Sequence, residues 1–363
     1  MPVYLDHAAT TPVTAAARAA MLDGLSAWAN PSSPHAAGRA ARAALERARG
    51  AIAAAYGWTG EVLLTSGASE SLAIALTRAT AARRFVSAVE HDAVFRACSD
   101  AQVLPVDGGG LLSPSALQAV LAGQPGTERA LVCVQWANSE TGVIQPVAAM
   151  AQAAHAAGAL LLLDAAQMPP GADPDAVAAA DLVALSAHKH GGPPGTGALL
   201  VRDLAALAPT GGQERGYRSG TENLPGVLGH AAALAEPVDL TRLATLRGRL
   251  DDAVARSGGE VVAAASPRHP AIGSYRLPGV AATTQLIRLD LAGFQVSAGS
   301  ACASGSMKPS HVLAAMGWGD VASREVIRVS LGRATTAEEV EAFIAAWRTV
   351  ARETRRFAGE RAA

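Results

Sequence analysis

The sequence predicts an α/β protein in which a large domain, built on a mostly parallel sheet, is joined to a smaller α+β domain. Three observations support this prediction. Short, unbroken apolar runs, typical of buried strands, alternate with stretches of helical period as far as Gly229. This alternation is typical of a largely parallel sheet covered by helices on both faces. Beyond Gly229 the pattern changes to longer helices and short strands, and 363 residues suffice for about two domains.

The first part of the chain supplies the elements of the large domain. It opens with a short strand or arm at 4–12, a helix at 15–27, a loop at 30–35 that contains two prolines and two serines, and an amphipathic helix at 39–55 that ends before Gly57. The expected strands are then 62–65, 85–89, 102–106, 131–136, 160–163, 182–185 and 198–201, with helices at 66–80, 113–121 and 147–157.

The last part supplies the small domain. One or two helices with charged faces are expected at 231–256, followed by strands at 272–276, 285–289 and 326–330 and an amphipathic helix at 337–355. A Gly- and Ser-rich loop begins at 298 and contains Cys302. We therefore place the large domain at 13–240, and the small domain at 1–12 together with 241–363, with the cysteine loop at about 298–310.

Composition limits the function. Half of the residues are hydrophobic, so a large core forms without disulfides, and the formal net charge of -1 argues against a nucleic-acid-binding protein. The start lacks a basic region followed by an apolar core, so we expect no signal peptide, and no apolar run approaches the ~20 residues that cross a bilayer. Three cysteines without close spacing fit a reducing compartment. These features predict a cytoplasmic protein without membrane contact.

Lys189 stands out because the chain has only one other lysine, Lys308. It follows a buried apolar run and lies among Ser186, His188 and His190, before a turn rich in glycine and proline. A partly desolvated lysine amine in such a place is suited to a Schiff base with an aldehyde. The alternative is an ordinary loop lysine near a strand end.

Other polar residues also stand at predicted strand ends. The stretch SGASES, Ser66–Ser71, opens a helix and predicts either an anion site at the helix N-terminus or a simple N-cap. Asp164 ends a buried strand, where a carboxylate needs a cationic partner, and a helix N-cap is its alternative. Because ligands in such sheets bind beyond the strand ends, these residues indicate a single site.

Three further side chains have a functional and a structural interpretation. Asn138 either hydrogen-bonds a ligand or shapes a turn. His91 ends a third strand, where it is either a structural histidine or one of the polar strand-end residues of the site. Arg333 follows a strand and could hold a carboxylate in a bidentate fork, although a surface arginine is the simpler interpretation.

Cys302 differs from the other two cysteines. It lies among glycine, alanine and serine, which favours an accessible nucleophilic thiol, and Lys308 and His311 are close enough in sequence to lower its pKa. Cys133 alternates with valines as core filler, and Cys98 is expected in a helix.

The order of these stretches resembles that of the class V aminotransferases, and within them the NifS/IscS-type cysteine desulfurases of group I. The matching stretches are YLDHAATTP, NPSSPHAAGR, LTSGASES, EHDAV, NSETGVIQP, LLLDAAQ, LSAHKHGGPPGTGAL, GGQERGYRSGTEN, GSACASGSMKPSHVL and SLGRATT, which together extend from Tyr4 to Thr336. The resemblance implies a fold-type I transferase dependent on pyridoxal 5'-phosphate, and a homodimer.

The resemblance also implies a role for each matching residue. Lys189 would carry the cofactor as a Schiff base, His91 would stack on its ring and assist proton transfer, and Asp164 would pair with the ring nitrogen. The remaining cofactor contacts would be Gln167 and Asn138 at the ring hydroxyl, Ala68, Ser69, Ser186 and His188 at the phosphate, and Thr221 at the phosphate of the neighbouring subunit. Arg333, with Asn138, would bind the substrate, and Cys302 would accept the sulfur.

The implied reaction removes sulfur from L-cysteine, releases L-alanine and leaves a persulfide on Cys302. A sulfur-acceptor or iron-sulfur scaffold protein would then take the sulfur. A selenocysteine lyase, another class V aminotransferase or lyase, and a non-catalytic partner protein of the same fold are the alternatives. The sequence leaves open which acceptor is used and whether Cys302 is a transient iron-sulfur ligand.

Overall fold

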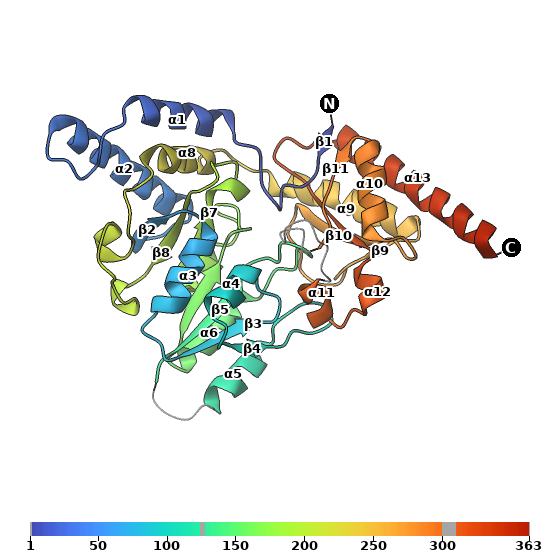
Figure 1. Ribbon diagram of the computed structural model, residues 1–363. Coiled ribbons are helices and arrows are strands. Elements are labelled where there is room, and N and C mark those ends of the chain that lie inside the picture. The colour runs from blue at the N-terminus through green and yellow to red at the C-terminus, as the bar shows by residue number, and fades with distance from the viewer. Residues whose placement is uncertain (1, 124–127, 300–309, 363) are drawn as a thin grey trace.

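A computed structural model of the protein describes residues 2–123, 128–299 and 310–362. A seven-stranded sheet forms the centre of the larger part (Figure 1). Its strands, in spatial order, are β2 (Glu61–Thr65), β8 (Gly197–Val201), β7 (Leu182–Ser186), β6 (Leu160–Asp164), β5 (Ala130–Gln135), β3 (Arg83–Ser87) and β4 (Gln102–Leu104). Only β8 pairs antiparallel with its neighbours in this sheet, so the predicted mostly parallel α/β sheet is confirmed.

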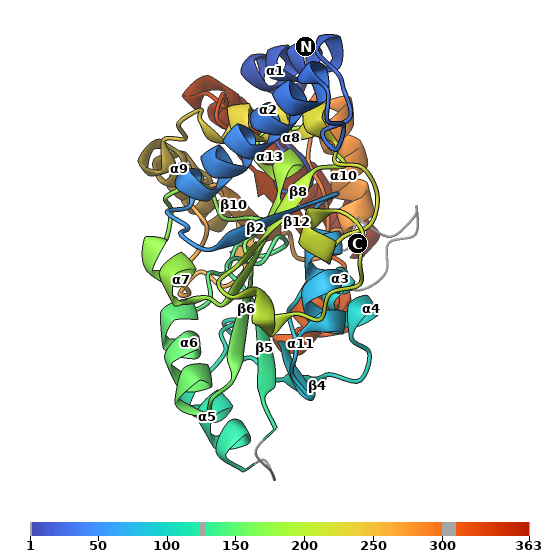
Figure 2. The same ribbon diagram turned by 90° about the vertical axis from the view of Figure 1, so that its left-hand side faces the viewer.

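Helices cover both faces of this sheet (Figure 2). Successive residues of a strand point to opposite faces, and in β6 Leu161 and Leu163 join one hydrophobic cluster while Leu160 and Leu162 join another. The first cluster includes side chains of α2 (Ala36–Ala55), α5 (Pro114–Ala122), α6 (Val147–Ala156), α7 (Pro174–Ala179) and α8 (Leu224–Leu234). The second includes those of α3 (Ala68–Arg78) and α4 (Asp92–Ala97), while α1 (Ala15–Ser26) packs on α8.

The smaller part has its own antiparallel sheet and its own core. Strand β10 (Ile272–Arg276) lies between β12 (Val326–Ser330) and β9 (Glu260–Val261). Helices α9 (Leu240–Arg256), α10 (Ala282–Leu291) and α13 (Ala337–Ala362) surround it, and Leu250, Ile327, Phe343 and Trp347 belong to one buried cluster. Two short helices, α11 (His311–Ala315) and α12 (Asp320–Ser323), precede β12.

The N-terminal arm joins the two parts. Strand β1 (Val3–Tyr4) pairs in parallel with β11 (Phe294–Gln295) of the smaller part. The following residues cross towards β7: the Thr11 amide donates to the carbonyl of His188, and Thr14 donates to Gly191. The domains at 13–240 and at 1–12 with 241–363 stay a prediction, and the predicted boundary falls after Leu240, the first residue of α9.

One predicted strand is wrong. Residues 285–289 lie inside helix α10, not in a strand. Ala282, Gln285 and Leu289 are buried, and this spacing of three and four residues is that of one helical face. Ile287 and Leu291 are exposed, so the apolar run that suggests a strand includes residues on the solvent side of the helix.

The described residues contain no helix that is both long enough and apolar enough to cross a membrane.

Candidate functional site

Lys189 lies at the carboxyl end of β7, as predicted. The strand ends at Ser186, and a 3₁₀ turn, Ala187–Lys189, carries the lysine beyond the sheet edge. Its amine donates hydrogen bonds to the carbonyls of Ala8 at 2.5 Å and Ala9 at 2.9 Å. The Gln167 amide also donates to Ala8, at 2.8 Å. The N-terminal arm therefore holds the amine with neutral acceptors.

A cavity of about 380 Å³ opens beside this amine. Such a volume is in the range of small-molecule and cofactor sites. Most of the predicted site residues line it: Ala68, Ser69, His91, Asp164, Gln167, Ser186, His188 and Lys189. They follow the ends of β3, β6 and β7 or lie at the start of α3. The polar residues that we selected at predicted strand ends therefore lie together around one cavity.

One end of the cavity is the N-terminus of α3. Gly67 is its N-cap residue, with a φ of 149°, and no side chain caps this helix. The first backbone N–H groups of a helix attract anions when no side chain satisfies them. The turn also lies close to β8, because a Cβ on Gly197 would stand 2.5 Å from the Cα of Gly67. Gly197, without a side chain, lets β8 pack this closely against the turn that begins α3.

Asp164 and His91 form the polar floor of the cavity. Asp164 is buried at the end of β6, and one carboxylate oxygen accepts the Ala166 amide at 2.9 Å. Burial raises the pKa of this carboxyl, whereas the hydrogen bond from Ala166 and the nearby His91 and Lys189 side chains act to lower it. Burial lowers the pKa of His91. The Nδ1 atom of His91 accepts the Ala93 amide at 3.1 Å, so the neutral ring carries its proton on Nε2.

Asn138 takes part in a turn. Its side-chain oxygen accepts the amides of Glu140 and Thr141, both at 2.9 Å, and its nitrogen donates to the Val89 carbonyl at 3.0 Å. Its neighbours Ala137 and Ser139 line the cavity, whereas Asn138 is not among the lining residues. The contacts of Asn138 in this structure are those of a residue that shapes a turn.

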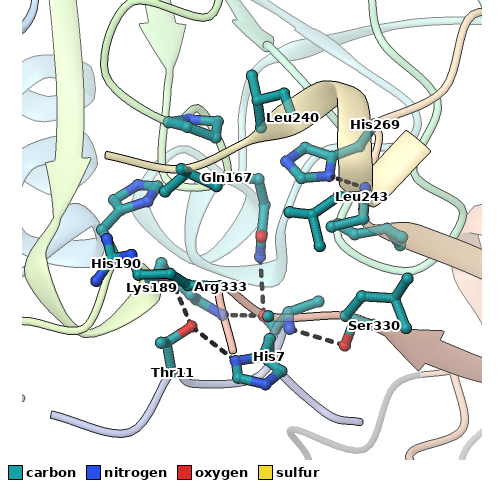
Figure 3. A pocket seen from close by; sticks show the side chains of 17 residues that line it. His7, Thr11, Gln167, Lys189, His190, Leu240, Leu243, His269, Ser330 and Arg333 are labelled. Carbon is teal, nitrogen blue, oxygen red and sulfur yellow. Dashed lines mark hydrogen bonds between the residues drawn. The ribbon is translucent and has the colours of Figure 1, made fainter. Parts of the chain in front are cut away.

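Arg333 lies in an adjoining pocket of about 60 Å³ that also contains Lys189, His7 and His269 (Figure 3). Its guanidinium donates to the Glu236 carboxylate at 2.9 Å and to the Glu236 carbonyl at 3.2 Å. Arg333, which we predicted to bind a substrate carboxylate, is therefore paired in this structure with a carboxylate of the chain itself.

The remaining predicted residues are Thr221 and Cys302. Thr221 is solvent-exposed and does not line the cavity. Cys302 and Lys308 lie outside the described residues. Next to that segment, Ser310 donates to Glu140 at 2.5 Å and His311 contacts the Glu90 carbonyl at 2.9 Å. Cys98 and Cys133 are free and buried, as expected of structural cysteines. The described residues contain no His, Cys, Asp or Glu cluster that could hold a metal ion.

The sequence interpretation missed several residues near the cavity. The carbonyls of Ala8 and Ala9 were missed because backbone acceptors leave no signal in a residue type. Gln135 lines the cavity but ends an apolar strand that suggested only core packing. Arg328 is buried in β12, where it pairs with Asp6 at 2.7 Å and donates to the Ser139 carbonyl at 2.9 Å.

Fold-type I pyridoxal phosphate enzymes bind the cofactor aldehyde through a lysine amine and the cofactor phosphate at a helix N-terminus. The comparison with family models agrees with this class. The chain belongs to the class-V aminotransferase family, whose model matches residues 3–343.

Known proteins resemble it along nearly the whole chain. It is 40% identical over 364 residues to a cysteine desulfurase of Cereibacter sphaeroides, covering 93% of each chain. It is 37% identical to an IscS-like cysteine desulfurase of Mycobacterium tuberculosis, again covering 93% of each. A solved NifS-like protein from Rickettsia africae superposes with a TM-score of 0.86 at 28% identity, covering 96% of this chain and 99% of that one.

The residues present fit the pyridoxal phosphate on which this family depends. The uncapped start of α3 suits the phosphate, and the amine of Lys189 lies in the same cavity. Burial raises the pKa of Asp164, so a protonated pyridine nitrogen beside it would restore the ionised form of that carboxyl.

Proposed function

We propose that this protein is a pyridoxal-phosphate-dependent cysteine desulfurase that converts L-cysteine to L-alanine and transfers the sulfur. The observation that carries the proposal is the position of Lys189, at a strand end in a cavity that also contains an uncapped helix N-terminus and Asp164. The cysteine desulfurases to which the chain is 34–40% identical over more than nine-tenths of its length support the choice of reaction.

When bound, the cofactor supplies an electron sink for the bonds of the substrate Cα atom. In our proposal, Asp164 would hold the ring nitrogen of the cofactor and, in its ionised form, would favour the protonated ring. The amine of Lys189, which donates to the carbonyls of Ala8 and Ala9, would hold the cofactor aldehyde and would serve as the group that moves the Cα proton. His91 is neutral because burial lowers its pKa, so it is able to accept that proton instead.

The substrate carboxylate has two candidate arginines. We propose Arg333, which shares a pocket with Lys189 and would exchange its Glu236 partner for the substrate. Arg328 is the second candidate because it donates to the carbonyl of Ser139, a residue of the cavity wall. We expect Arg333→Gln to raise KM for L-cysteine about tenfold or more. An unchanged KM in that variant, with a raised KM in Arg328→Gln, would transfer the role to Arg328.

The proposal includes Cys302 as the sulfur acceptor. Its thiolate attacks the sulfur of the substrate, the S–S bond forms and the C–S bond breaks. The electron pair of the broken bond stays with the carbon that becomes the methyl group of alanine, which then takes a proton. The persulfide passes its outer sulfur to a second protein, for which an iron-sulfur scaffold is our first candidate. A transient cluster ligand role for Cys302 is a further expectation.

We also propose that the protein acts as a cytoplasmic homodimer. Thr221 is exposed in the single chain, as expected for a side chain that reaches the phosphate of a neighbouring subunit. The two described cysteines are free thiols, which fits a reducing compartment.

The test is to measure alanine and sulfide released from L-cysteine in the presence of a thiol reductant. We expect equal yields of the two products from the wild-type protein and loss of both in Cys302→Ala. Turnover that persists in Cys302→Ala would favour a lyase, and selenocysteine turnover alone would favour a selenocysteine lyase. A protein that binds the cofactor and forms no alanine would contradict the desulfurase proposal.

A further inference from the structure

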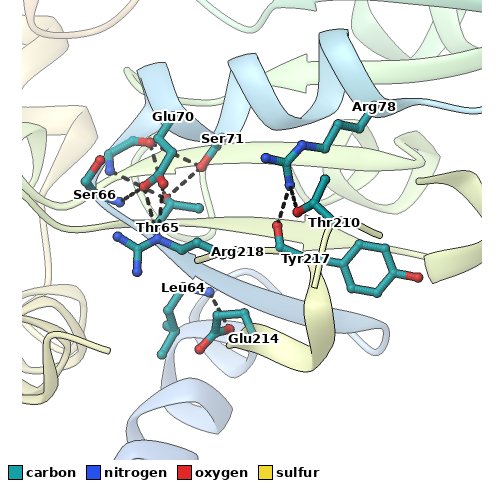
Figure 4. Close-up of polar contacts among 11 residues, drawn as sticks. Leu64, Thr65, Ser66, Glu70, Ser71, Arg78, Thr210, Glu214, Tyr217 and Arg218 are labelled. Atoms are coloured by element: carbon teal, nitrogen blue, oxygen red, sulfur yellow. Dashed lines mark hydrogen bonds and ion pairs between the residues drawn. The ribbon is translucent and has the colours of Figure 1, made fainter. Parts of the chain in front are cut away.

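The turn that begins α3 is held by an ion pair from a distant segment (Figure 4). Glu70, in the first turn of α3, accepts the backbone amide of Ser66 at 2.5 Å. The Nε atom of Arg218 donates to both oxygens of the same carboxylate, at 3.1 and 3.3 Å. Glu70 also lines the cavity. Arg218 therefore contacts the cofactor cavity indirectly, through Glu70.

The segment that carries Arg218 is fixed at two other points. Glu214 is buried, accepts the Leu64 amide at 2.8 Å and pairs with Arg49 at 2.6 Å. Arg78, from the far end of α3, donates to the Tyr217 carbonyl at 2.9 Å. These contacts anchor the backbone at residues 214 and 217, directly before Arg218.

Glu70 creates an electrostatic conflict in a phosphate site. Burial raises the pKa of this carboxyl, but its hydrogen bonds with Ser66 and its contact with Arg218 together lower it, so the group is ionised. An ionised carboxylate in the first helical turn would repel a phosphate dianion held by the same turn. The positive charge of Arg218 offsets that repulsion while Glu70 keeps the Ser66 backbone in place.

We propose that Arg218 is a positioning residue for the phosphate-binding turn, and that its function is to neutralise Glu70. The proposal rests on the proposed function, because it takes the cofactor phosphate as the anion. Arg218 also lies three residues before Thr221. The same segment would therefore support the phosphate site of its own chain and offer Thr221 to the neighbouring one.

The test is a double-mutant cycle on the affinity of the apoenzyme for pyridoxal phosphate, measured by absorbance titration. In Arg218→Gln an ionised Glu70 faces the phosphate, and we expect the apparent Kd to rise about tenfold or more. In Glu70→Gln the amide oxygen still accepts the Ser66 amide and Arg218 stays positive, so we expect a change of less than about threefold. The double variant should return to within about threefold of the wild type.

Two controls separate this charge effect from a loss of structure. Pyridoxal lacks the phosphate, so its affinity should be the same in Arg218→Gln and in the wild type. Arg96→Gln removes an exposed arginine that pairs with Asp92 at 2.8 Å on α4, and it should leave both affinities unchanged. Equal Tm values of the apoenzymes would exclude unfolding as the cause.

The proposal is overturned if the double variant binds pyridoxal phosphate as weakly as Arg218→Gln, or if pyridoxal binding weakens equally. Both results would indicate that Arg218 only supports the fold of its segment. A wild-type protein that binds pyridoxal phosphate without turning over L-cysteine would contradict the proposed activity and leave this test intact. A wild-type protein that does not bind pyridoxal phosphate would contradict both.

Discussion

Asp164 of the larger part and Asp251 in helix α9 of the smaller part are carboxylates that differ in their hydrogen-bond partners. In the seven-stranded sheet, Asp164 ends a strand beside the cavity and accepts a backbone amide. In the smaller part, Asp251 accepts hydrogen bonds from Arg247 at 2.6 Å, Arg268 at 2.7 Å and the Tyr275 hydroxyl at 2.8 Å. The second carboxylate is satisfied by the protein itself, whereas the first faces a site for a ligand.

Glu90 extends this comparison. It is fully buried behind the cavity, and one of its oxygens accepts the Gln135 amide at 3.0 Å. The other oxygen has no hydrogen-bond partner among the described residues. Burial raises the pKa of Glu90, and the charge of Asp164 raises it further. A buried polar group without a partner is costly for stability, so such groups gather where binding and chemistry take place, while paired groups such as Asp251 stabilise the fold.

The strongest test of this contrast compares Asp164→Asn with Asp251→Asn. In our proposal Asp164→Asn removes the charge that would pair with the cofactor nitrogen, and we expect kcat to fall about 10²-fold or more while Tm stays the same or rises. Asp251→Asn leaves two arginines without their carboxylate, and we expect a loss of about 3 kcal/mol in the free energy of unfolding, with kcat of the folded fraction unchanged. Urea unfolding and steady-state kinetics on both variants measure these effects. A stability loss in Asp164→Asn equal to that in Asp251→Asn would remove the contrast.

The second test uses the pH dependence of Glu90. A carboxyl with a raised pKa in the folded state binds more protons there than in the unfolded chain, so its ionisation destabilises the fold as pH rises above the unfolded value. Glu90→Gln removes this effect. We expect the variant and the wild type to have similar stability near pH 4.5, the ordinary pKa of a glutamate, and the variant to gain above it, by up to about 1.4 kcal/mol per pH unit. Parallel stability profiles would contradict the neutral state of Glu90.

The third test concerns His230, which is fully buried in α8 with no hydrogen-bond partner for either ring nitrogen among the described residues. Burial lowers its pKa from 6.5 to about 4. Its neutral form is therefore favoured in the fold, and the stability it supports is present above the unfolded value and lost as pH falls towards 4. We expect the advantage of His230→Leu over the wild type to grow by roughly 2 kcal/mol between pH 8 and pH 5. An advantage independent of pH would show that His230 does not resist protonation.

The sequence predicted the large sheet well because its strands are short apolar runs, each followed by a polar residue that lies at the strand end. Cavity residues such as Asp164 and His188 carry that signal themselves. The contacts between distant segments carry none: the arm carbonyl that holds Lys189 is 181 positions away, and Glu70 and Arg218 are 148 apart. Helix α10 was taken in part for a strand because exposed Ile287 and Leu291 hide its helical period.

The central claim is that Lys189 carries the cofactor, and the chain contains only one other lysine, Lys308. The most direct measurement is to reduce the cofactor-loaded protein with borohydride, digest it, and locate the phosphopyridoxyl group by peptide mass spectrometry. Our account predicts one modified lysine per chain, at Lys189, and no modification in Lys189→Ala. Stoichiometric modification at Lys308, or a cofactor that is never fixed to the chain by reduction, would contradict it.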